Sequence, residues 1–465
     1  MDLNLFQASL HRKYGKMFRE KWGPKWQVHV SDPDLIEEIY RHEGRYPFRP
    51  SLQPWLLYRQ IKNLPHGITT AQGMEWQHYR TEFGKRLFCP SATKSLIEPL
   101  SNVADDFVTK VETVLADCNQ NFDDNCNKEI YFAKQLPNIS YLWSLEAAGS
   151  FLFETRLGCL APSIPTRTQK FLDSLQEMMT SSLYLIVGEK IHQRLNTRFW
   201  RKHEKSWDNI FSFGKTLIDE KLLSLESSEE VTGPYLSHLL KNKNLTMNQI
   251  YTNITELLMA GSDTTANTFC FVLYMLANNP DKQNLLRQEI QSIMSMSSFA
   301  ASHNHLEDMK YLKCVIKETM RLYPVVTMNC RVLNQDIQLD GYTIPKETLF
   351  VMNHYAASID EDNFHDPNKF LPERWLREGD VSQQQHKVQQ QTDIKKHPFA
   401  SLPFGYGSRS CLGKHVGKME LMVTLIKVLD KFDVKPLVEQ QDLKPVLRTL
   451  LTPGQLVPVR LCRRY

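Results

Sequence analysis

The sequence predicts a mainly α-helical protein that carries only small β-sheets. Apolar residues recur at helical spacing along most of the 465-residue chain. The longest such pattern covers residues 246–277. Strand-like alternation is confined to short stretches at residues 26–30, 331–333, 337–339 and 348–351, with Asp340-Gly341 as a turn signal.

The long helix has recognisable signals at both ends. Thr246 and Gln249 form a capping box, and Asn278-Asn279-Pro280 is a stop. About 32 residues at 1.5 Å each give a helix of roughly 50 Å. Polar residues inside it include Asn253, Glu256, Asp263 and Thr264. They make it a poor membrane segment and favour a helix that crosses a large soluble domain.

A length of 465 residues allows two or three average domains or one large one, and we expect a single domain over residues 1–465. No linker rich in Pro, Gly or Ser divides the chain, and 42% hydrophobic with 23% charged residues is a globular balance. A net charge of +4, with the basic residues spread along the chain, gives no indication of a nucleic-acid partner. Nine cysteines without a C-x-x-C pair argue against a disulfide framework and a zinc site, and for a reducing compartment.

Two other regions carry expectations. Residues 381–396 are polar and rich in glutamine, which predicts a mobile surface insert within the domain. The N-terminal residues contain neither an apolar run that could span a bilayer nor the apolar region of a signal peptide. We therefore expect a soluble or peripheral protein, or one whose targeting segment is not in this chain.

The most informative segment is residues 404–413, where Cys411 lies at the end of a glycine-rich turn. A thiolate can ligate haem iron, and glycines let the backbone approach a flat macrocycle. Arg409 can pair with a haem propionate. A lone cysteine after a glycine turn is more often structural, but the ten-residue pattern with its arginine favours the ligand.

This segment matches the haem-binding signature of the cytochrome P450 family at every fixed position. The matching residues are Phe404, Gly407, Arg409, Cys411 and Gly413. The resemblance covers nearly the whole chain. It implies the cytochrome P450 fold, with haem b between the long central helix and the helix after Cys411, and Phe404, Gly405 and Gly413 beside the cofactor.

The centre of the long helix contains Gly261, Asp263 and Thr264. A glycine there costs about 1 kcal/mol relative to alanine, which indicates a packing or functional reason. Taken alone, the segment is either a kink with satisfied polar groups or a proton relay. It resembles the family's oxygen-binding helix, which implies that Thr264 and Asp263 deliver protons during catalysis.

Other family positions are matched in order along the chain. Glu318 and Arg321, three apart on one helix, with Arg374 downstream, resemble a structural triad. Trp76, Arg80 and Arg331 resemble the residues that hold the haem propionates. Each alone reads as an ordinary core tryptophan or surface arginine.

Several stretches resemble the mitochondrial branch of the family, above all its sterol 27-hydroxylase and vitamin D hydroxylase members. They are residues 153–160, 207–221, 256–261 and 322–326. The branch implies electrons from a small acidic 2Fe–2S ferredoxin, docked by Lys313, Lys317 and Lys414. A solvated lysine face is the plain alternative. His415 replaces a usual arginine, and Lys418 stands where an acid is common, so docking is expected to be weaker or differently oriented.

The resemblance implies a haem-thiolate monooxygenase that uses O₂ to hydroxylate a sterol or secosteroid on its side chain. A haem-thiolate isomerase or lyase and a non-catalytic haem- or sterol-binding protein are the alternatives. Residues 181–187 and 198–202 suit a peripheral contact with the inner mitochondrial membrane, or a buried helix followed by a surface helix. The expected location is the matrix face of that membrane, with the transit peptide absent or removed.

Overall fold

A computed structural model describes residues 3–22, 25–88, 94–121, 125–226, 235–294, 303–377, 397–437, 441–447 and 449–464. The predicted insert at residues 381–396 lies outside these ranges. The chain forms two compact units. The first comprises residues 1–48, 104–141 and 264–465, and the second residues 49–103 and 142–263. The mainly helical class with small sheets is confirmed.

The largest described sheet belongs to the first unit. It has four strands in the order β1 (Met17–Trp22), β2 (Lys25–Val30), β6 (Leu349–Met352) and β3 (Asn329–Val332). β2 pairs parallel with β6, whereas the other two pairings are antiparallel. Three of these strands match the predicted stretches within two residues. Strand β1 was missed, because its sequence lacks alternation and it pairs on one side only.

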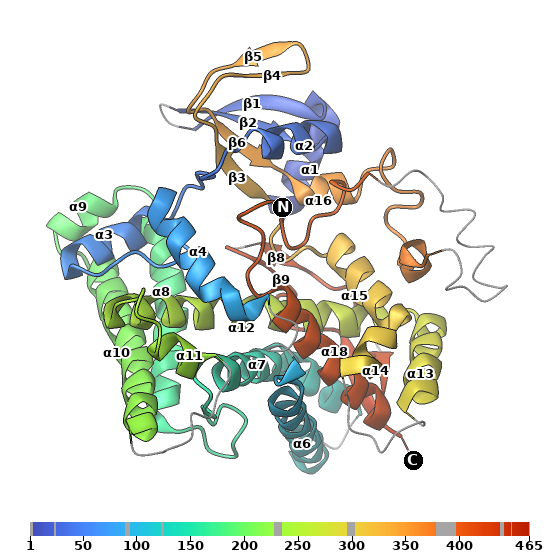
Figure 1. The fold of residues 1–465 in the computed structure, drawn as a ribbon. Helices are drawn as coiled ribbons and strands as arrows, with labels where there is room; N and C mark the ends of the chain where they lie inside the picture. Colours follow the sequence, from blue (N-terminus) through green and yellow to red (C-terminus); the bar gives the residue numbers. More distant parts are fainter. Residues whose placement is uncertain are drawn as a thin grey trace. The chain divides into compact units, whose positions relative to one another are not determined.

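Helix α2 (Pro33–Arg41) covers this sheet (Figure 1). Ile36 and Ile39 pack with Val30, Phe350 and other buried apolar side chains of the sheet. Asp32 caps the helix by accepting hydrogen bonds from the backbone of Asp34 and Leu35.

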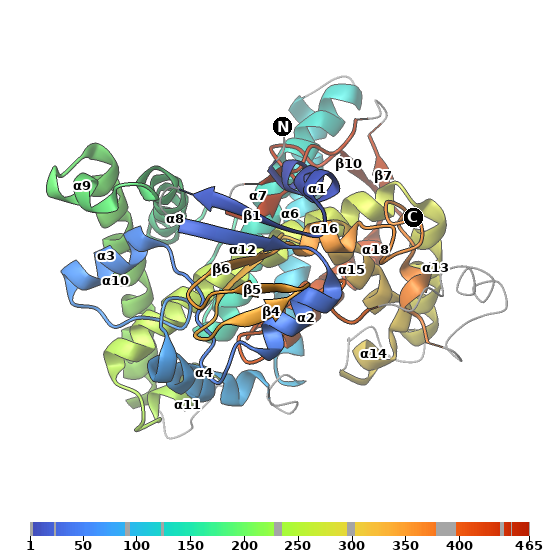
Figure 2. The same ribbon diagram turned by 90° about the horizontal axis from the view of Figure 1, so that it is seen from above.

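A β-hairpin follows β3; it extends from the sheet in Figure 1 and is seen from above in Figure 2. Strands β4 (Ile337–Leu339) and β5 (Tyr342–Ile344) are joined by Asp340 and Gly341, whose φ angles are 48° and 77°. Two consecutive residues with positive φ make a tight hairpin turn, which an Asp-Gly pair adopts readily. The predicted turn signal is confirmed.

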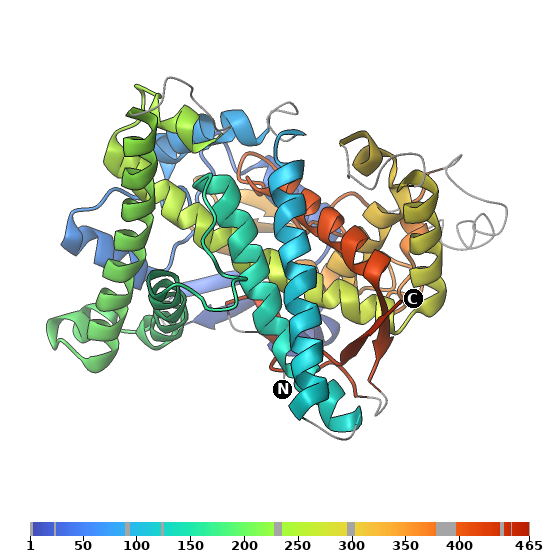
Figure 3. The same ribbon diagram turned by 90° about the horizontal axis from the view of Figure 1, so that it is seen from below.

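The other described helices and strands of the first unit are several helices and two small sheets. Helix α18 (Lys414–Lys431), red in Figure 3, leads directly into β7 (Phe432–Pro436), which pairs with β10 (Val459–Arg463). The other elements are α1 (Leu3–Tyr14), α13 (Pro280–Met294), α14 (His303–Asp308), α15 (Lys310–Leu322), α16 (His354–Ser358), the 3₁₀ turn η1 (Pro372–Trp375), β8 (Val446–Leu447) and β9 (Leu451–Thr452).

In its described part the second unit is helical. Helices α8 (Thr166–Leu185) and α10 (Arg198–Glu226) lie side by side, with Phe171 stacked on Phe213 at a centroid distance of 4.3 Å. The other elements are α3 (Gln53–Lys62), α4 (Gly73–Leu87), α9 (Glu189–Arg194) and α11 (Leu236–Leu240). Helices α6 (Ile97–Asn121), α7 (Asn125–Leu152) and α12 (Met247–Ala277) contribute residues to both units.

The long helix α12 begins and ends where the sequence predicts. The backbone N–H of Gln249 donates to Thr246 Oγ1 at 3.3 Å, and the N–H of Thr246 donates to Gln249 Oε1 at 2.9 Å. This reciprocal pair is a capping box. Among the described residues, no helix combines the length and apolarity needed to cross a membrane.

Gly214 lets α10 pack closely against α12 within the second unit. A Cβ atom added at Gly214 would collide with Oγ1 of the buried Thr255. We expect Gly214→Ala to lower the free energy of unfolding by about 1–3 kcal/mol, the usual cost of overpacking. Urea unfolding followed by circular dichroism measures this change.

The matched control is Gly214→Ala in a Thr255→Ala background, where the colliding hydroxyl is gone. In that background Gly214→Ala should lower the free energy of unfolding little, because alanine has a higher helix propensity than glycine. An equal loss in both backgrounds would contradict the packing explanation.

Candidate haem-binding site

The loop before α18 holds Cys411 at the surface of the first unit. The N–H of Cys411 donates to the carbonyl of Phe404 at 2.8 Å, and the N–H of Ser410 to the carbonyl of Gly407 at 3.1 Å. Gly405 and Gly407 have φ angles of 66° and 73°, which side chains other than glycine rarely adopt. Cys411 is exposed, whereas the other cysteines with described surroundings are buried or half-buried. The loop therefore presents one thiol on a backbone that its own hydrogen bonds hold in place.

One predicted cofactor contact, Arg409, belongs to this loop, and another, Arg331, lies near it. Arg409 donates from Nε to the carbonyl of Pro47 at 2.8 Å. Arg331 is buried and donates from Nε to Glu43 at 2.7 Å. Burial raises the pKa of Glu43, and Arg331 opposes that rise. Arg331 therefore already has a carboxylate partner, which a propionate would have to share.

Helix α18 packs on the second half of α12. A Cβ atom added at Gly417 would lie 3.5 Å from Thr265 Oγ1, which is ordinary contact. Thr265 follows Thr264, and Gly417 lies six residues after Cys411. The first unit thus brings the cysteine loop and Thr264 to neighbouring parts of two packed helices.

The middle of α12 is more open than the buried stretches on either side of it. Ala260 is exposed, and Gly261 and Thr264 are half-buried, while Leu258 and Phe269 are fully buried. A Cβ atom on Gly261 would find its nearest neighbour, Ala148, at 3.7 Å. Packing within the second unit therefore does not require the glycine, and the space beside it is available to something else.

Asp263 lies within this open stretch. Burial raises its pKa to about 6. A carboxyl group with a pKa near neutrality can both accept and release a proton at physiological pH. The position suits the proton transfer that the sequence predicts.

The surroundings of these residues fit a haem group. An exposed thiol on a glycine-rich loop could hold haem iron as its thiolate ligand. Gly413 has no heavy atom within 4 Å of an added Cβ, so a flat ring could approach its backbone. Trp76 (3% exposed) and Arg80 lie one turn apart on α4 in the second unit. The Arg80 guanidinium lies 5.0 Å from the Phe88 ring.

The residues Glu318, Arg321 and Arg374 meet in the core of the first unit. Arg321 donates to both carboxylate oxygens of Glu318, at 2.7 and 2.9 Å, and Arg374 Nε donates to Glu318 at 2.9 Å. All three side chains are at most 1% exposed. Burial lowers the pKa of Arg374. Trp375 Nε1 also donates to Glu318, at 2.8 Å, which the sequence did not indicate.

The predicted docking lysines form a positive surface on the first unit. A pocket of about 430 Å³ is lined by Lys310, Lys313, Cys314, Lys317, Trp375, Leu376 and Arg377. Lys317 places Nζ 3.8 Å from the centre of the Trp375 ring, and burial lowers its pKa. Burial, and then Lys414, Lys317 and Lys313, lower the pKa of Lys418 to about 8. Mutual repulsion in this group indicates a surface suited to an acidic partner.

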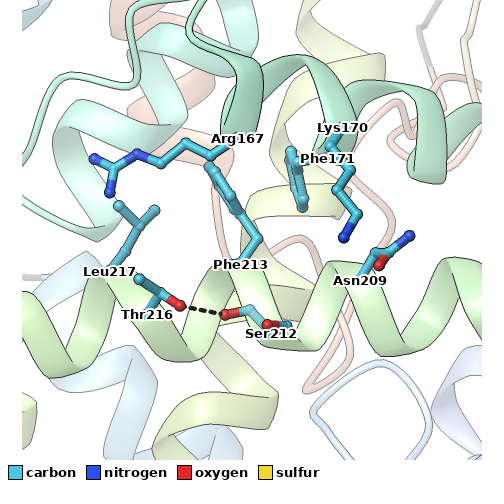
Figure 4. A pocket seen from close by; sticks show the side chains of 8 residues that line it. All are labelled: Arg167, Lys170, Phe171, Asn209, Ser212, Phe213, Thr216 and Leu217. Atoms are coloured by element: carbon cyan, nitrogen blue, oxygen red, sulfur yellow. Dashed lines mark hydrogen bonds between the residues drawn. The ribbon is translucent and has the colours of Figure 1, made fainter.

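A second, smaller pocket lies between α8 and α10 in the second unit (Figure 4). Its volume is about 150 Å³, below the roughly 300–1,000 Å³ typical of small-molecule sites. Arg167 on its edge is paired with Glu220 at 2.7 Å. This pocket does not match any of the predicted site residues.

The end of α8 and helix α9 expose a group of apolar side chains. Tyr184, Val187, Ile191 and Leu195 are 59–83% exposed. Trp200, which the sequence suggested as a membrane anchor, is only 3% exposed, so that interpretation was wrong. Helical periodicity did not separate its buried face from the exposed basic residues Arg201 and Lys202.

Sequence reasoning missed two functional neighbours. Glu43, the partner of Arg331, carries no local signal because it lies 288 residues away in the chain. Glu256 was noted only as a polar residue inside α12, and its buried ion pair with Arg59 was not foreseen. A charged residue within an apolar helix was the available signal.

With this geometry described, comparison with known proteins decides the family. The Cytochrome P450 family profile matches residues 1–457. The chain belongs to the cytochrome P450 family. It is a cytochrome P450 monooxygenase, and haem is its cofactor.

The relatives come from the branch that the sequence resembles. Mouse (Mus musculus) mitochondrial sterol 26-hydroxylase is 36% identical, over 97% of this chain and 83% of its own length. The human (Homo sapiens) sterol 26-hydroxylase is 35% identical, over 100% and 85%. Rat (Rattus norvegicus) mitochondrial 1,25-dihydroxyvitamin D(3) 24-hydroxylase is 33% identical, over 97% and 82%. The predicted family and branch are confirmed.

Removing the charge of Glu318 should damage the fold of this P450. Glu318→Gln leaves Arg321 and Arg374 buried without their carboxylate, so we expect a loss of about 3–5 kcal/mol in the free energy of unfolding. The fraction of purified protein that incorporates haem should fall with it. Urea unfolding and the Soret-to-protein absorbance ratio measure the two effects.

Arg41→Ala is the control, because it removes an exposed pair with Glu37 and should cost less than about 0.5 kcal/mol. If Glu318→Gln were no more harmful than this control, the buried triad would not support the fold.

Proposed function

We propose that this P450 hydroxylates a sterol or secosteroid, on the side chain, with electrons from an acidic 2Fe–2S ferredoxin. The observation that carries the proposal is the 33–36% identity to sterol and vitamin D hydroxylases over nearly the whole chain. The intact cysteine loop and the open segment of α12 support the same reading.

The residues would share the work as follows. Cys411 would ligate the haem iron, with Phe404, Gly405 and Gly413 against the ring. Trp76, Arg80, Arg331 and Arg409 would bind the propionates. Haem with a thiolate ligand activates dioxygen so that one oxygen atom enters a C–H bond. Glu318, Arg321 and Arg374 would hold the chain behind the cysteine loop and take no part in the chemistry.

Proton delivery would fall to Asp263 and Thr264. The hydroxyl of Thr268 donates to the carbonyl of Thr264 at 2.8 Å, which ties the next turn to this position. The raised pKa of Asp263 allows it to exchange protons with solvent near pH 6. An isomerase or lyase that consumes no dioxygen has no need of such a pair.

The partner and location follow from the branch. Lys313, Lys317 and Lys414 would bind the ferredoxin through its acidic surface. The matrix face of the inner mitochondrial membrane is the proposed location, since the sterol and vitamin D relatives described above are named as mitochondrial. The exposed apolar group at the end of α8 and on α9 would contact that membrane, where sterols dissolve.

Turnover of cholesterol tests the function directly. The haem-loaded protein with ferredoxin, ferredoxin reductase and NADPH should give a side-chain alcohol, identified by mass spectrometry. Thr264→Ala should lower product per NADPH by about 10²-fold, since a positioned proton donor contributes at least that much. The lost product should be replaced by hydrogen peroxide, which is quantified in the same reaction.

Retained product in Thr264→Ala would remove the assigned role of this residue. Absence of any alcohol from cholesterol or vitamin D₃, with a normal carbon monoxide spectrum, would refute the proposed substrate class while leaving the family unchanged.

Ferredoxin binding should depend on pH through Lys418. Because its pKa is lowered to about 8, Lys418 is the docking-surface lysine expected to lose charge first between pH 7 and 9. Affinity for the acidic ferredoxin should therefore fall over this range, by about two- to fivefold for one surface charge. Surface plasmon resonance at constant ionic strength measures it.

At pH 7 the Lys418→Gln variant should bind ferredoxin with the affinity that the unchanged protein has at pH 9. Its affinity should also depend less on pH. Lys346→Gln, which removes an exposed lysine outside the group formed by Lys313, Lys317, Lys414 and Lys418, should keep the original profile. If ferredoxin affinity fell equally steeply with pH in Lys418→Gln and in the unchanged protein, a group other than Lys418 would be responsible.

A further inference from the structure

Glu256 is a buried carboxylate on α12 whose oxygens are taken up by one loop and one arginine. It is 2% exposed. One oxygen accepts from Arg59 Nη2, and from Thr70 Oγ1 at 3.4 Å. The other accepts from the N–H of Thr69 at 2.9 Å and from the Thr69 hydroxyl. The loop of residues 67–71, between α3 and α4, is thereby fastened to the long helix.

Arg59 brings two further helices to the same carboxylate. It is fully buried on α3, and Nη1 donates to the carbonyl of Trp55 at 3.2 Å. Its guanidinium lies 5.0 Å from the Trp207 ring and 5.6 Å from the Phe211 ring, both on α10. Cation–π contact and the ion pair together satisfy a charge that would otherwise be costly to bury.

The loop backbone lies directly on α12. The N–H of Ile68 donates to Asn253 Oδ1 at 2.7 Å, and Asn253 precedes Glu256 by three residues on the same helix face. A Cβ atom added at Gly67 would collide with the Glu256 carboxylate. Gly67 is therefore required by close approach, and the loop position is fixed at three successive residues.

This anchor lies close to the open segment of α12. Ala260 is one turn beyond Glu256, and Asp263 is two turns beyond it on the same face, roughly 10 Å along the helix. The loop is therefore attached to α12 one turn before Ala260, where haem and substrate chemistry is proposed. A displaced loop would change the surroundings of α12 next to this stretch.

We propose that Glu256 is a positioning residue that fixes the loop of residues 67–71 and thereby sets substrate affinity and the carbon that is hydroxylated. This inference rests on the proposed hydroxylation for its regioselectivity, but its effect on the loop and on the space beside Asp263 does not depend on the substrate. Glu256 itself takes no part in oxygen chemistry.

Three variants test the proposal by weakening the contact between Glu256 and the loop to different extents. Glu256→Gln removes the charge, Thr69→Val removes one side-chain hydrogen bond, and Gly67→Ala pushes the loop from the carboxylate. The milder two keep the test valid if Glu256→Gln fails to fold. Glu146→Gln is the matched control, since Glu146 is also buried in the second unit and accepts from Arg156, Leu157 and Cys159, away from this loop.

Hydrogen exchange of the haem-loaded protein reports on the loop. Peptides covering residues 63–72 should exchange at least tenfold faster in the three variants and unchanged in Glu146→Gln. Soret titrations with clotrimazole and with imidazole report on the space beside Asp263. The affinity for clotrimazole, which is bulky, should change at least threefold, whereas the affinity for imidazole should stay constant. Unchanged loop exchange, or unchanged clotrimazole affinity, would overturn the proposal.

Turnover of cholesterol supplies the remaining readout. KM and the ratio of alcohol products should each change at least threefold, with the summed kcat reduced less than KM is raised. If loop exchange rises but KM and product ratio match those of Glu146→Gln, Glu256 is structural only. If the unchanged protein makes no alcohol from cholesterol, the proposed substrate fails, and the exchange and azole titrations still decide the role of Glu256.

Discussion

A single buried carboxylate, Glu318, organises the first unit. It satisfies two arginines and a tryptophan that come from α15 and from the segment at η1. Neither arginine could be buried without it, because an unpaired guanidinium in the core costs several kcal/mol. Arg321 in turn donates to the carbonyls of Ser358 and Pro367, which ties the long connection after α16 to the helix. The attachment of residues 358–375 to α15 depends on this one charge.

The second unit also contains buried carboxylates that hold distant segments together. Glu256, Glu146 and Glu154 are each buried or nearly so, and each accepts hydrogen bonds from backbone amides of a loop. A carboxylate is acceptor-only and has two oxygens, so it can hold several N–H groups of irregular backbone at once. These loops are therefore held by charge as well as by apolar contact. This gives them defined positions without regular secondary structure.

The proposed chemistry needs openness in an otherwise dense interior. Core packing leaves few voids, yet α12 exposes Ala260 midway along its length and the cysteine loop exposes Cys411. Both exposures occur at small or glycine-rich positions, where little side-chain volume fills the space. Asp263 lies at the edge of its opening, and burial there raises its pKa toward neutrality. The local packing of α12 thus determines both the opening at Ala260 and the raised pKa of Asp263.

The sequence by itself determined the features that depend on neighbouring residues. The fold class, the capping box of α12, the Asp340-Gly341 turn and the cysteine loop follow from local backbone preferences and short motifs, and the structure contains the first three as predicted. The assigned roles of Cys411, Thr264 and the lysines stay predictions. Only the tertiary structure decided which distant side chains meet: Arg331 with Glu43, Glu256 with Arg59, and Trp200 with the interior. Such pairs are set by how helices pack, and periodicity shows which face of a helix is apolar without showing what it will face.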